Sequence, residues 1–225
     1  MPEITNVKAC VFDAYGTLFD IHAPTAAIAN ELGDKAQSLS DMWRGKQLQY
    51  TWLRSLMGRY TDFWQITGDG LDYALAAHDI DNPDIRARLM DLYMTLEAYP
   101  DAVSTLEQLK AAGYATGILS NGSHKMLAAA VEASGLKPLL DEVLSVEDVG
   151  IFKPDGRVYQ MAVDRLGVQK EEICFVSANA WDAAGAADFG FQVAHLNRFN
   201  QPPERLPGQP KAIMKSLSEL PPVLA

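Results

Sequence analysis

The stretch that most constrains the fold of this chain is the sequence CVFDAYGTL at residues 10–18. Apolar or small residues lead into Asp13, and Gly16 follows as a residue that lets the chain turn away. This pattern predicts a buried strand ending at Asp13, at the carboxyl edge of an open α/β sheet, where ligands usually bind. Asp13 is therefore a candidate nucleophile, and from this stretch alone an aspartate that caps a turn is an equal alternative.

From residue 99 onward, short apolar runs alternate with helical patterns. The predicted helices cover 102–112, 123–134, 155–166 and 181–189, and the predicted strands cover 114–119, 142–145, 173–177 and 192–196. A glycine follows each of these helices, as is common at helix ends. With a first strand at 8–12, the pattern predicts an α/β fold, a Rossmann-like parallel sheet with helices on both faces.

The segment from Pro24 to Glu97 has a helical pattern throughout. Breaks near 33–34, 61–62 and 81–83 divide it into four predicted helices, with Ser40 or Asp41 and also Asn82 as candidate N-caps. We therefore expect a discontinuous core domain at 1–18 and 99–225, interrupted by a helical cap domain at 19–98. The proline-rich tail after residue 200 is expected to wrap the core with one short helix at 211–217.

Charge and composition exclude several function classes. The formal net charge of −10 disfavours nucleic acid and anionic membranes as partners. No signal peptide or membrane-spanning run is visible, so a cytoplasmic location is expected. Cys10 and Cys174 fall in predicted strands as buried residues, and the histidines at 22, 78, 124 and 195 have no ligand spacing, so no metal is expected.

Polar side chains follow successive strands of the predicted sheet, and the carboxyl ends of parallel strands meet at one edge. They are Asp13, Tyr15 and Thr17 after the first strand, Ser120 and Asn121 after the second, Lys153 after the third, and Ser177, Asn179 and Asp182 after the fourth. Lys153 would keep Asp13 ionised as a nucleophile requires, and Asp182 would hold Lys153 or orient a water. Taken singly, Ser120 reads as a turn residue, Lys153 as a surface lysine, and Asn179 as a helix cap.

Five segments carry a resemblance to a known family. They are residues 13–20 (DAYGTLFD), 119–123 (LSNGS), Lys153-Pro154 with Val158-Tyr159, 177–182 (SANAWD), and 42–54 (MWRGKQLQYTWLR) in the helical segment. The chain resembles the haloacid dehalogenase superfamily over nearly its whole length, and within it the (S)-2-haloacid dehalogenases. The resemblance implies a Rossmann-like core with an inserted helical cap. It also implies a small 2-haloacid as substrate and a second copy of the chain, in a homodimer, as partner.

The resemblance also implies a mechanism and a division of roles. Asp13 attacks the carbon that bears the halogen with inversion, and water then hydrolyses the resulting aspartyl ester. Halide would be received by Arg44, Asn121 and Trp181, with Leu48 lining the pocket, and the substrate carboxylate would be held by Ser120, Lys153 and the backbone amides near Tyr15. Asp13 and the water would be positioned by Thr17, Lys153, Ser177, Asn179 and Asp182, and Tyr159 would support Lys153. As alternatives, Arg44 is a solvent-facing arginine, and Trp181 and Phe63 are packing aromatics, which is the favoured interpretation for Phe63.

One position separates this chain from the phosphatases of the superfamily. They carry a second aspartate two residues after the nucleophile, where this chain has Tyr15. The 177–182 segment offers only one ionisable residue, Asp182, so few ligands remain for Mg²⁺, and no cofactor is expected. Gly45, Gly150, Phe152 and Ala178 depart from the usual family residues. A phosphate-monoester phosphatase and a non-catalytic binding domain remain as alternatives.

Overall fold

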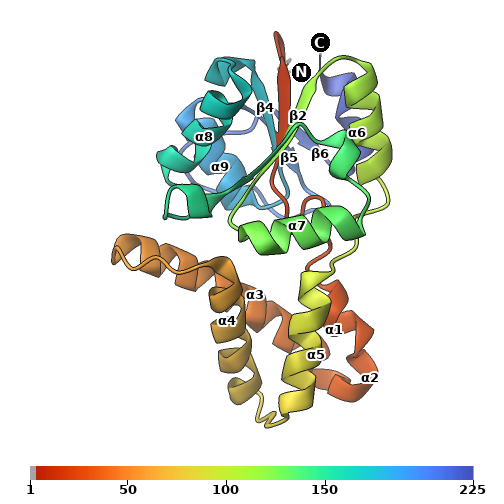
Figure 1. The fold of residues 1–225 in the computed structure, drawn as a ribbon, viewed down its shortest axis with the longest axis vertical. Helices are drawn as coiled ribbons and strands as arrows, with labels where there is room; N and C mark the ends of the chain where they lie inside the picture. Colours follow the sequence, from red (N-terminus) through yellow and green to blue (C-terminus); the bar gives the residue numbers. More distant parts are fainter. Residues whose placement is uncertain (1–3, 225) are drawn as a thin grey trace.

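A parallel β-sheet with helices on both faces forms the upper part of the molecule in the computed structural model, which describes residues 4–224 (Figure 1). The strand order in the described residues is β3-β2-β1-β4-β5-β6. The strands are β1 (Ala9–Phe12), β2 (Ala115–Ser120), β3 (Glu142–Ser145), β4 (Ile173–Ser177), β5 (Gln192–Leu196) and β6 (Ala212–Met214). The predicted α/β class with a Rossmann-like parallel sheet is confirmed.

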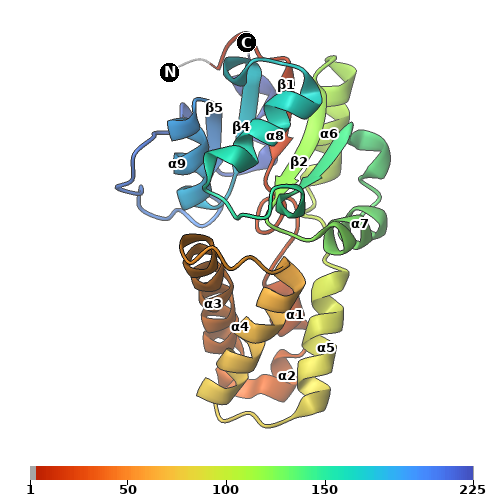
Figure 2. The same ribbon diagram turned by 60° about the vertical axis from the view of Figure 1, so that its left-hand side comes forward.

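Four helices flank the sheet and follow its strands in turn. They are α6 (Ala102–Ala111), α7 (His124–Ala133), α8 (Gly156–Leu166) and α9 (Ala180–Phe189). Figure 2 shows α6 and α7 on one side of the sheet and α8 and α9 on the other. The last two end at glycines in the left-handed region, Gly167 with φ 66° and Gly190 with φ 116°. Both strands at the centre, β1 and β4, are fully buried, as their apolar sequences require.

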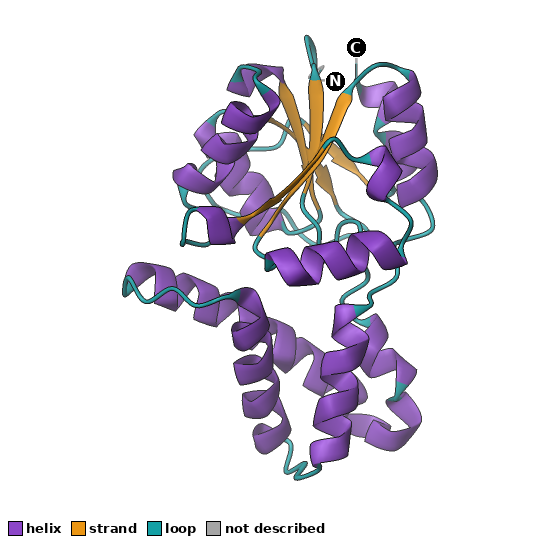
Figure 3. Ribbon diagram, in the orientation of Figure 1, coloured by secondary structure: helices purple, strands orange, loops and turns teal. Residues whose placement is uncertain are grey.

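Five helices lie between β1 and α6 and form a separate layer below the sheet (Figure 3). They are α1 (Ala23–Ala27), α2 (Ala29–Leu32), α3 (Ala36–Leu56), α4 (Phe63–Ala77) and α5 (Pro83–Met94), and we call them the cap helices. The expectation of four helices was wrong, because the first predicted helix is interrupted at Ile28, whose backbone (φ −117°, ψ 22°) leaves helical geometry.

The proposed helix caps had mixed outcomes. Asn82 is the N-cap of α5, and its side chain accepts hydrogen bonds from the backbone of Asp84 and Ile85. Ser40 and Asp41 are not caps, because α3 already begins at Ala36. The Ser40 hydroxyl is instead buried against His22, with 2.9 Å between Oγ and Nδ1.

The two chain segments that connect the cap helices to the sheet run side by side. The backbone N–H of Tyr99 donates to the carbonyl of Leu18 at 2.8 Å, and that of Asp20 donates to Glu97 at 3.2 Å. An antiparallel bridge joins Phe19 to Ala98 between them. Because Leu18 follows closely after β1, the cap helices are connected to the sheet at its carboxyl edge.

The tail does not contain the predicted helix at 211–217. Residues Ala212–Met214 form β6, which pairs in parallel with β5 through Ala194, His195 and Leu196. The backbone of β5 has an open edge on this side, and hydrogen bonding to that edge outweighs the helical pattern of the tail sequence.

Two further expectations concern burial and membrane spans. Cys10 and Cys174 are register partners on β1 and β4 and are both fully buried, as expected. In residues 4–224, the helices are all too short or too polar to cross a membrane.

Candidate active site

Three strands bring the candidate residues to one edge of the sheet. In the parallel register Phe12 lies opposite Ile118 of β2 and Val176 of β4. The residues that follow, Asp13 on one strand and Ser177 on another, therefore lie side by side at the carboxyl edge. Gly16 then turns the chain with a φ of 90°, a conformation that favours glycine.

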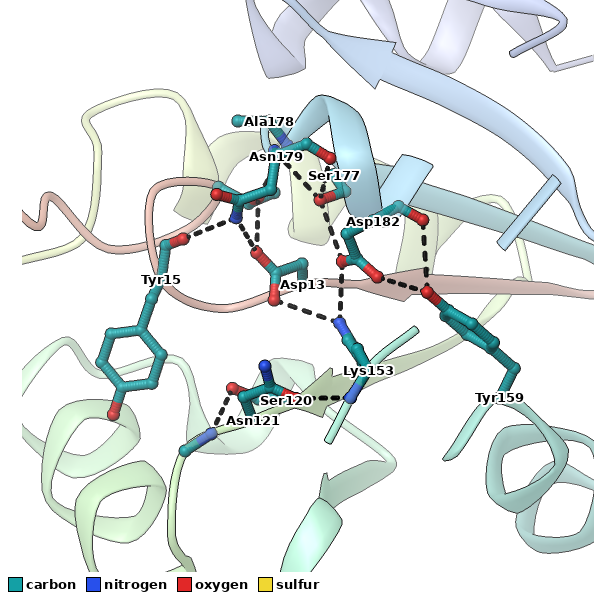
Figure 4. A network of polar contacts seen from close by, with 12 residues as sticks. Asp13, Tyr15, Ser120, Asn121, Lys153, Tyr159, Ser177, Ala178, Asn179 and Asp182 are labelled. Atoms are coloured by element: carbon teal, nitrogen blue, oxygen red, sulfur yellow. Dashed lines mark hydrogen bonds and ion pairs between the residues drawn. The ribbon is translucent and has the colours of Figure 1, made fainter. Parts of the chain in front are cut away.

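Asp13 lies at the centre of a network of hydrogen bonds (Figure 4). Its Oδ1 accepts from Lys153 Nζ at 3.1 Å, and its Oδ2 accepts from Asn179 Nδ2 at 2.7 Å and from the Thr17 hydroxyl at 3.2 Å. The carboxyl group is buried, with 6% of the residue exposed. A buried carboxylate held in one orientation by a cation and two donors suits a nucleophile.

Lys153 is a buried cation between two carboxylates. Its Nζ donates to Asp182 Oδ2 at 2.9 Å as well as to Asp13, and only 1% of the residue is exposed. Burial acts to lower the pKa of Lys153, but the charges of Asp13 and Asp182 outweigh it and raise the pKa. The backbone N–H of Lys153 donates to Asn121 Oδ1 at 3.0 Å, so the amide of Asn121 holds the loop that delivers the lysine.

Asp182 is fully buried and is held by two hydroxyl groups besides Lys153. The Ser177 hydroxyl donates to its Oδ2 at 3.0 Å, and the Tyr159 hydroxyl donates to its Oδ1 at 2.8 Å (Figure 4). Burial and the charge of Asp182 raise the pKa of Tyr159, so its phenol keeps the proton that it donates. Tyr159 thus reaches Lys153 only through Asp182.

Asn179 joins the nucleophile to the cap helices. It occupies the N-cap position of α9, yet its side chain makes no capping hydrogen bond. Its Nδ2 instead donates to Asp13 and to the Tyr15 carbonyl, the latter at 3.0 Å, and its Oδ1 accepts from Arg44 Nη2 at 3.0 Å. The side chain is therefore used in the site rather than as a helix cap.

Arg44 faces a cavity of about 400 Å³ that Leu48, Asn179 and Trp181 also line. Within residues 4–224 Arg44 forms no ion pair, and the indole N–H of Trp181 and the hydroxyl of Tyr15 are buried without a hydrogen-bond partner. One N–H of Arg44 is used by Asn179 and the others remain as donors, and Trp181, which lines the same cavity, adds an indole N–H without an acceptor. Donors without acceptors are the chemistry of an anion site.

The segment after β2 serves the turn as well as the site. The Ser120 hydroxyl accepts from the backbone N–H of Gly122 at 3.0 Å, and Ser123 is the N-cap of α7. A side chain at Gly122 would place its Cβ 2.6 Å from Tyr15 Cε2, so only glycine fits beside this ring. Among the described residues, no group of three or more His, Cys, Asp or Glu side chains comes together as a metal site.

Comparison with known proteins identifies the family. The model of the haloacid dehalogenase-like hydrolases matches residues 7–190. The chain is 50% identical to (S)-2-haloacid dehalogenase 1 of Pseudomonas sp. (strain CBS-3) over 219 residues, 97% of this chain and 96% of the relative. The chain belongs to the (S)-2-haloacid dehalogenases of this hydrolase family.

Further members support the assignment of this dehalogenase family. The chain is 51% identical to (S)-2-haloacid dehalogenase 4A of Burkholderia cepacia over 223 residues, 99% of this chain and 96% of the relative. A crystal structure of a dehalogenase with an intermediate complex is 50% identical, covers 98% of both chains and has a TM-score of 0.96. An L-2-haloacid dehalogenase from Xanthobacter autotrophicus with chloropropionic acid covalently bound is 35% identical, covers 96% of this chain and 98% of its own, and has a TM-score of 0.90.

In this member of the haloacid dehalogenase-like hydrolases, the structure brings the predicted residues of the core together around Asp13, and Arg44 joins them from α3. Tyr93 of α5 is a neighbour of the site that was not predicted from the sequence, and its ring stacks on Tyr15 with a centroid distance of 5.7 Å and an interplanar angle of 16°. The only signal was an aromatic residue on an amphipathic helix, which is common in any helical core. Phe63 is 1% exposed and packs against Tyr15 and Phe152, as its packing interpretation predicts.

Proposed function

We propose that this chain is an (S)-2-haloacid dehalogenase that converts short 2-haloalkanoic acids to 2-hydroxy acids with inversion. The observation that carries the proposal is the environment of Asp13, whose buried carboxylate is held by Lys153 and Asn179 with Tyr15 two residues later. A departing halide needs no proton, so a tyrosine can replace the acid that a phosphoryl leaving group requires. The donors around Arg44 provide a place for the halide.

In the first step, a carboxylate oxygen of Asp13 attacks the α-carbon from the side opposite the halogen. A carbon–oxygen bond forms while the carbon–halogen bond breaks, and the halide leaves with the bonding electron pair. Arg44, Trp181 and the side-chain amide of Asn121 receive the halide. Fixed donors in a closed pocket stabilise the developing charge better than water that must reorganise.

The substrate carboxylate needs its own partners during this step. Ser120, Lys153 and the backbone amides near Tyr15 are assigned to it, with Leu48 lining the alkyl side. Two observations support this assignment. Ser120 directly precedes Asn121, whose side chain accepts a hydrogen bond from the backbone of Lys153. Leu48 lines the same cavity as Arg44.

In the second step, water attacks the carbonyl carbon of the aspartyl ester. The acyl carbon–oxygen bond breaks, one proton of the water passes to the departing oxygen so that the 2-hydroxy acid leaves, and the other proton is released to solvent. Asp13 is regenerated as a carboxylate with one oxygen from water. Lys153 and Asn179 donate to the two oxygens of this carboxyl group and stabilise the tetrahedral intermediate. Thr17, Ser177 and Asp182 position Asp13 and the water, with Tyr159 holding Asp182.

The test is halide release from each enantiomer of 2-chloropropionate, without added metal. We expect release from the (S)-enantiomer only, with (R)-lactate as product. Multiple turnovers in ¹⁸O water are expected to label the Asp13 side chain, detectable by mass spectrometry of the peptide. An unlabelled Asp13 after many turnovers would refute the ester intermediate.

The alternatives give different outcomes in the same assay. Release of phosphate from an aryl phosphate on addition of Mg²⁺, without halide release from 2-chloropropionate, would favour a phosphatase. Inertness toward a panel of 2-haloacids and toward aryl phosphates would favour a non-catalytic binding domain.

We also propose a domain division at 1–18 and 99–225 for the core and 19–98 for the cap. It is supported by the paired connecting segments at Phe19 and Ala98. Limited proteolysis is expected to cut at these connections before it cuts within either part.

A homodimer and a cytoplasmic location complete the proposal. Leu56 and Met57 at the end of α3 expose 85% and 69% of their surfaces, which supports association of two copies there. Light scattering on the purified protein is expected to give twice the mass of 24.6 kDa. The free thiols of Cys10 and Cys174 are typical of a reducing compartment, and cell fractionation tests the location.

A further inference from the structure

Arg198 is a largely buried cation at the carboxyl end of β5 that the proposed mechanism does not use. It follows β5 by two residues, and its side chain is 13% exposed. Its terminal nitrogens both donate to the carboxylate of Asp101, Nη1 to Oδ2 at 2.8 Å and Nη2 to Oδ1 at 2.9 Å. This paired contact fixes the plane of the guanidinium.

The same guanidinium reaches the segment that carries the nucleophile. Arg198 Nη2 has a second N–H group, which donates to the backbone carbonyl of Thr17 at 3.3 Å. Thr17 is fully buried, and among the residues that the structure describes its carbonyl accepts no other hydrogen bond. Without Arg198, this buried carbonyl would therefore lose its partner.

Thr17 passes the contact on to the reacting carboxylate. Its hydroxyl donates to Asp13 Oδ2 at 3.2 Å and accepts from the backbone N–H of Ala178 at 2.8 Å. The hydroxyl thus has one donor and one acceptor, and the position of its oxygen depends on where the Thr17 backbone lies. Arg198 is separated from Asp13 by this one residue.

Tyr99 supports the guanidinium from one face. The Cζ atom of Arg198 lies 4.1 Å from the centroid of the Tyr99 ring, close enough for a guanidinium to stack on an aromatic ring. The backbone N–H of Tyr99 donates to the carbonyl of Leu18, which directly follows Thr17. Arg198 therefore contacts both connections between the sheet and the cap helices, the first at Thr17 and the second at Tyr99.

We propose that Arg198 is a positioning residue for Asp13: it holds the backbone of Thr17, so that the Thr17 hydroxyl keeps the carboxylate in the orientation that attacks the α-carbon. The inference rests on the proposed function. Orientation contributes strongly to the rate, because displacement needs the attacking oxygen in line with the bond that breaks. Loss of Arg198 should therefore slow ester formation and leave the affinity for the substrate nearly unchanged.

The variant Arg198→Lys tests this role. A lysine keeps the charge beside Asp101, but its single nitrogen cannot replace a planar fork that donates to Asp101 and Thr17 together. The measurement is the single-turnover rate constant of ester formation with (S)-2-chloropropionate. This rate constant does not depend on the fraction of folded protein, and its dependence on substrate concentration gives the affinity separately.

We expect the rate constant in Arg198→Lys to fall about tenfold, the size of one or two lost hydrogen bonds, with the affinity within about twofold of wild type. An unchanged rate constant would overturn the inference. Arg198 also lines the cavity that Arg44 faces, so a direct contact with the substrate is the alternative. A weaker affinity with an unchanged rate constant would support that alternative and overturn the positioning role.

A double-mutant cycle with Thr17→Val shows whether the effect runs through the Thr17 hydroxyl. This substitution removes the hydroxyl and keeps the backbone carbonyl that Arg198 contacts. We expect Arg198→Lys to slow the Thr17→Val protein by no more than about twofold, because the hydroxyl that it positions is already gone. Two losses that simply multiply would contradict the proposal.

Ser216→Ala is the matched control. The Ser216 hydroxyl donates to Asp101 Oδ2 at 2.8 Å, so this variant weakens the contacts of Asp101 and leaves those of Thr17 in place. We expect lower stability toward urea and an unchanged rate constant of ester formation. A loss of rate as large as that in Arg198→Lys would show that the rate follows the attachment of the tail, and would overturn the inference.

A second variant keeps the inference testable if Arg198→Lys does not fold. Tyr99→Leu removes the ring on which the guanidinium stacks and keeps the backbone contact with Leu18. We expect a smaller fall in the same rate constant, and an unchanged value would count against the positioning role. Failure of the wild-type protein to release halide from either enantiomer would instead refute the proposed function.

Discussion

Arg44 and Asn179 are 135 residues apart in the chain, and a hydrogen bond of 3.0 Å between them joins the cap helices to the carboxyl edge of the sheet. The same Asn179 side chain holds Asp13 at 2.7 Å through its amide nitrogen. One amide therefore sets the distance between the nucleophile and the cation proposed to receive the leaving group. Displacement on a carbon centre needs the nucleophile and the leaving group in line, so we expect this contact to matter for the proposed first step.

Replacing Asp13 by asparagine is expected to lower halide release at least about a thousandfold, because the amide oxygen is a poor nucleophile. Steady-state halide release from (S)-2-chloropropionate checks this, on protein whose intact mass excludes deamidation. Asp20→Asn is the matched control, since Asp20 lies in the same segment and, within residues 4–224, its side chain accepts hydrogen bonds only from the His22 backbone and Tyr99. Wild-type rates in verified Asp13→Asn would refute the assignment.

Replacing Lys153 by alanine is expected to reduce kcat at least about tenfold and to shift the acidic limb of the pH–rate profile upward. The lysine now separates the charges of Asp13 and Asp182, and without it one of the two buried carboxylates takes up a proton at higher pH. Stability at pH 7 should fall by about 3–5 kcal/mol, measured by urea unfolding. An unchanged pH–rate profile would count against this pairing.

Replacing Gly45 by alanine is expected to raise the free energy of unfolding by about 0.5–1 kcal/mol. Gly45 lies on the exposed side of α3, and a Cβ there would meet no atom within 4 Å. Gly58→Ala is the control, because Gly58 has a φ of 62° and is expected to lose stability instead. A less stable Gly45→Ala would show that the helix requires flexibility beside Arg44.

Replacing Asp101 by asparagine is expected to destabilise the fold by about 2 kcal/mol at pH 7. Asp101 accepts from both terminal nitrogens of Arg198, at 2.8 and 2.9 Å, and from Ser216 and the Leu217 backbone. Burial acts to raise the pKa of Asp101, but these donors outweigh it and lower the pKa. The carboxylate of Asp101 thus links the tail residues Arg198, Ser216 and Leu217 to the start of α6.

The pH dependence of the stability lost in Asp101→Asn follows from the direction in which the pKa of Asp101 is shifted. A depressed pKa in the folded state stabilises the protein above the unfolded pKa of about 3.9, and this contribution is lost as the pH falls through the folded pKa. The difference between wild type and Asp101→Asn should therefore shrink below about pH 4. Glu132→Gln, in an exposed pair with Lys137, serves as the control, and a constant difference across the pH range would contradict the prediction.

The sequence predicted the sheet well, because its strands are apolar runs with clear ends. The strands at 173–177 and 192–196 were predicted to the residue, since a polar or glycine residue marks each boundary. The residues around Asp13 were predicted because parallel strands bring their ends together wherever the helices lie. The prediction of a helix at 211–217 was wrong, because Ala212–Met214 pair with the edge of β5. The local sequence of the tail contains no information about that edge.

The cap helices show what sequence reasoning could not provide. The break at Ile28 has no glycine or proline to signal it, and Ser40 resembles a cap although it is buried against His22. The sequence shows Tyr93 only as an aromatic residue on an amphipathic helix, and its stacking on Tyr15 depends on how α5 packs against the segment after β1.

The paired segments at Leu18 and Tyr99 leave and enter the sheet at the same place. A module whose two ends emerge next to each other can be exchanged, lengthened or lost while the order of the strands beneath it stays as it was. The part of the pocket that Arg44 and Leu48 line can therefore change in sequence without a change in the sheet that carries Asp13.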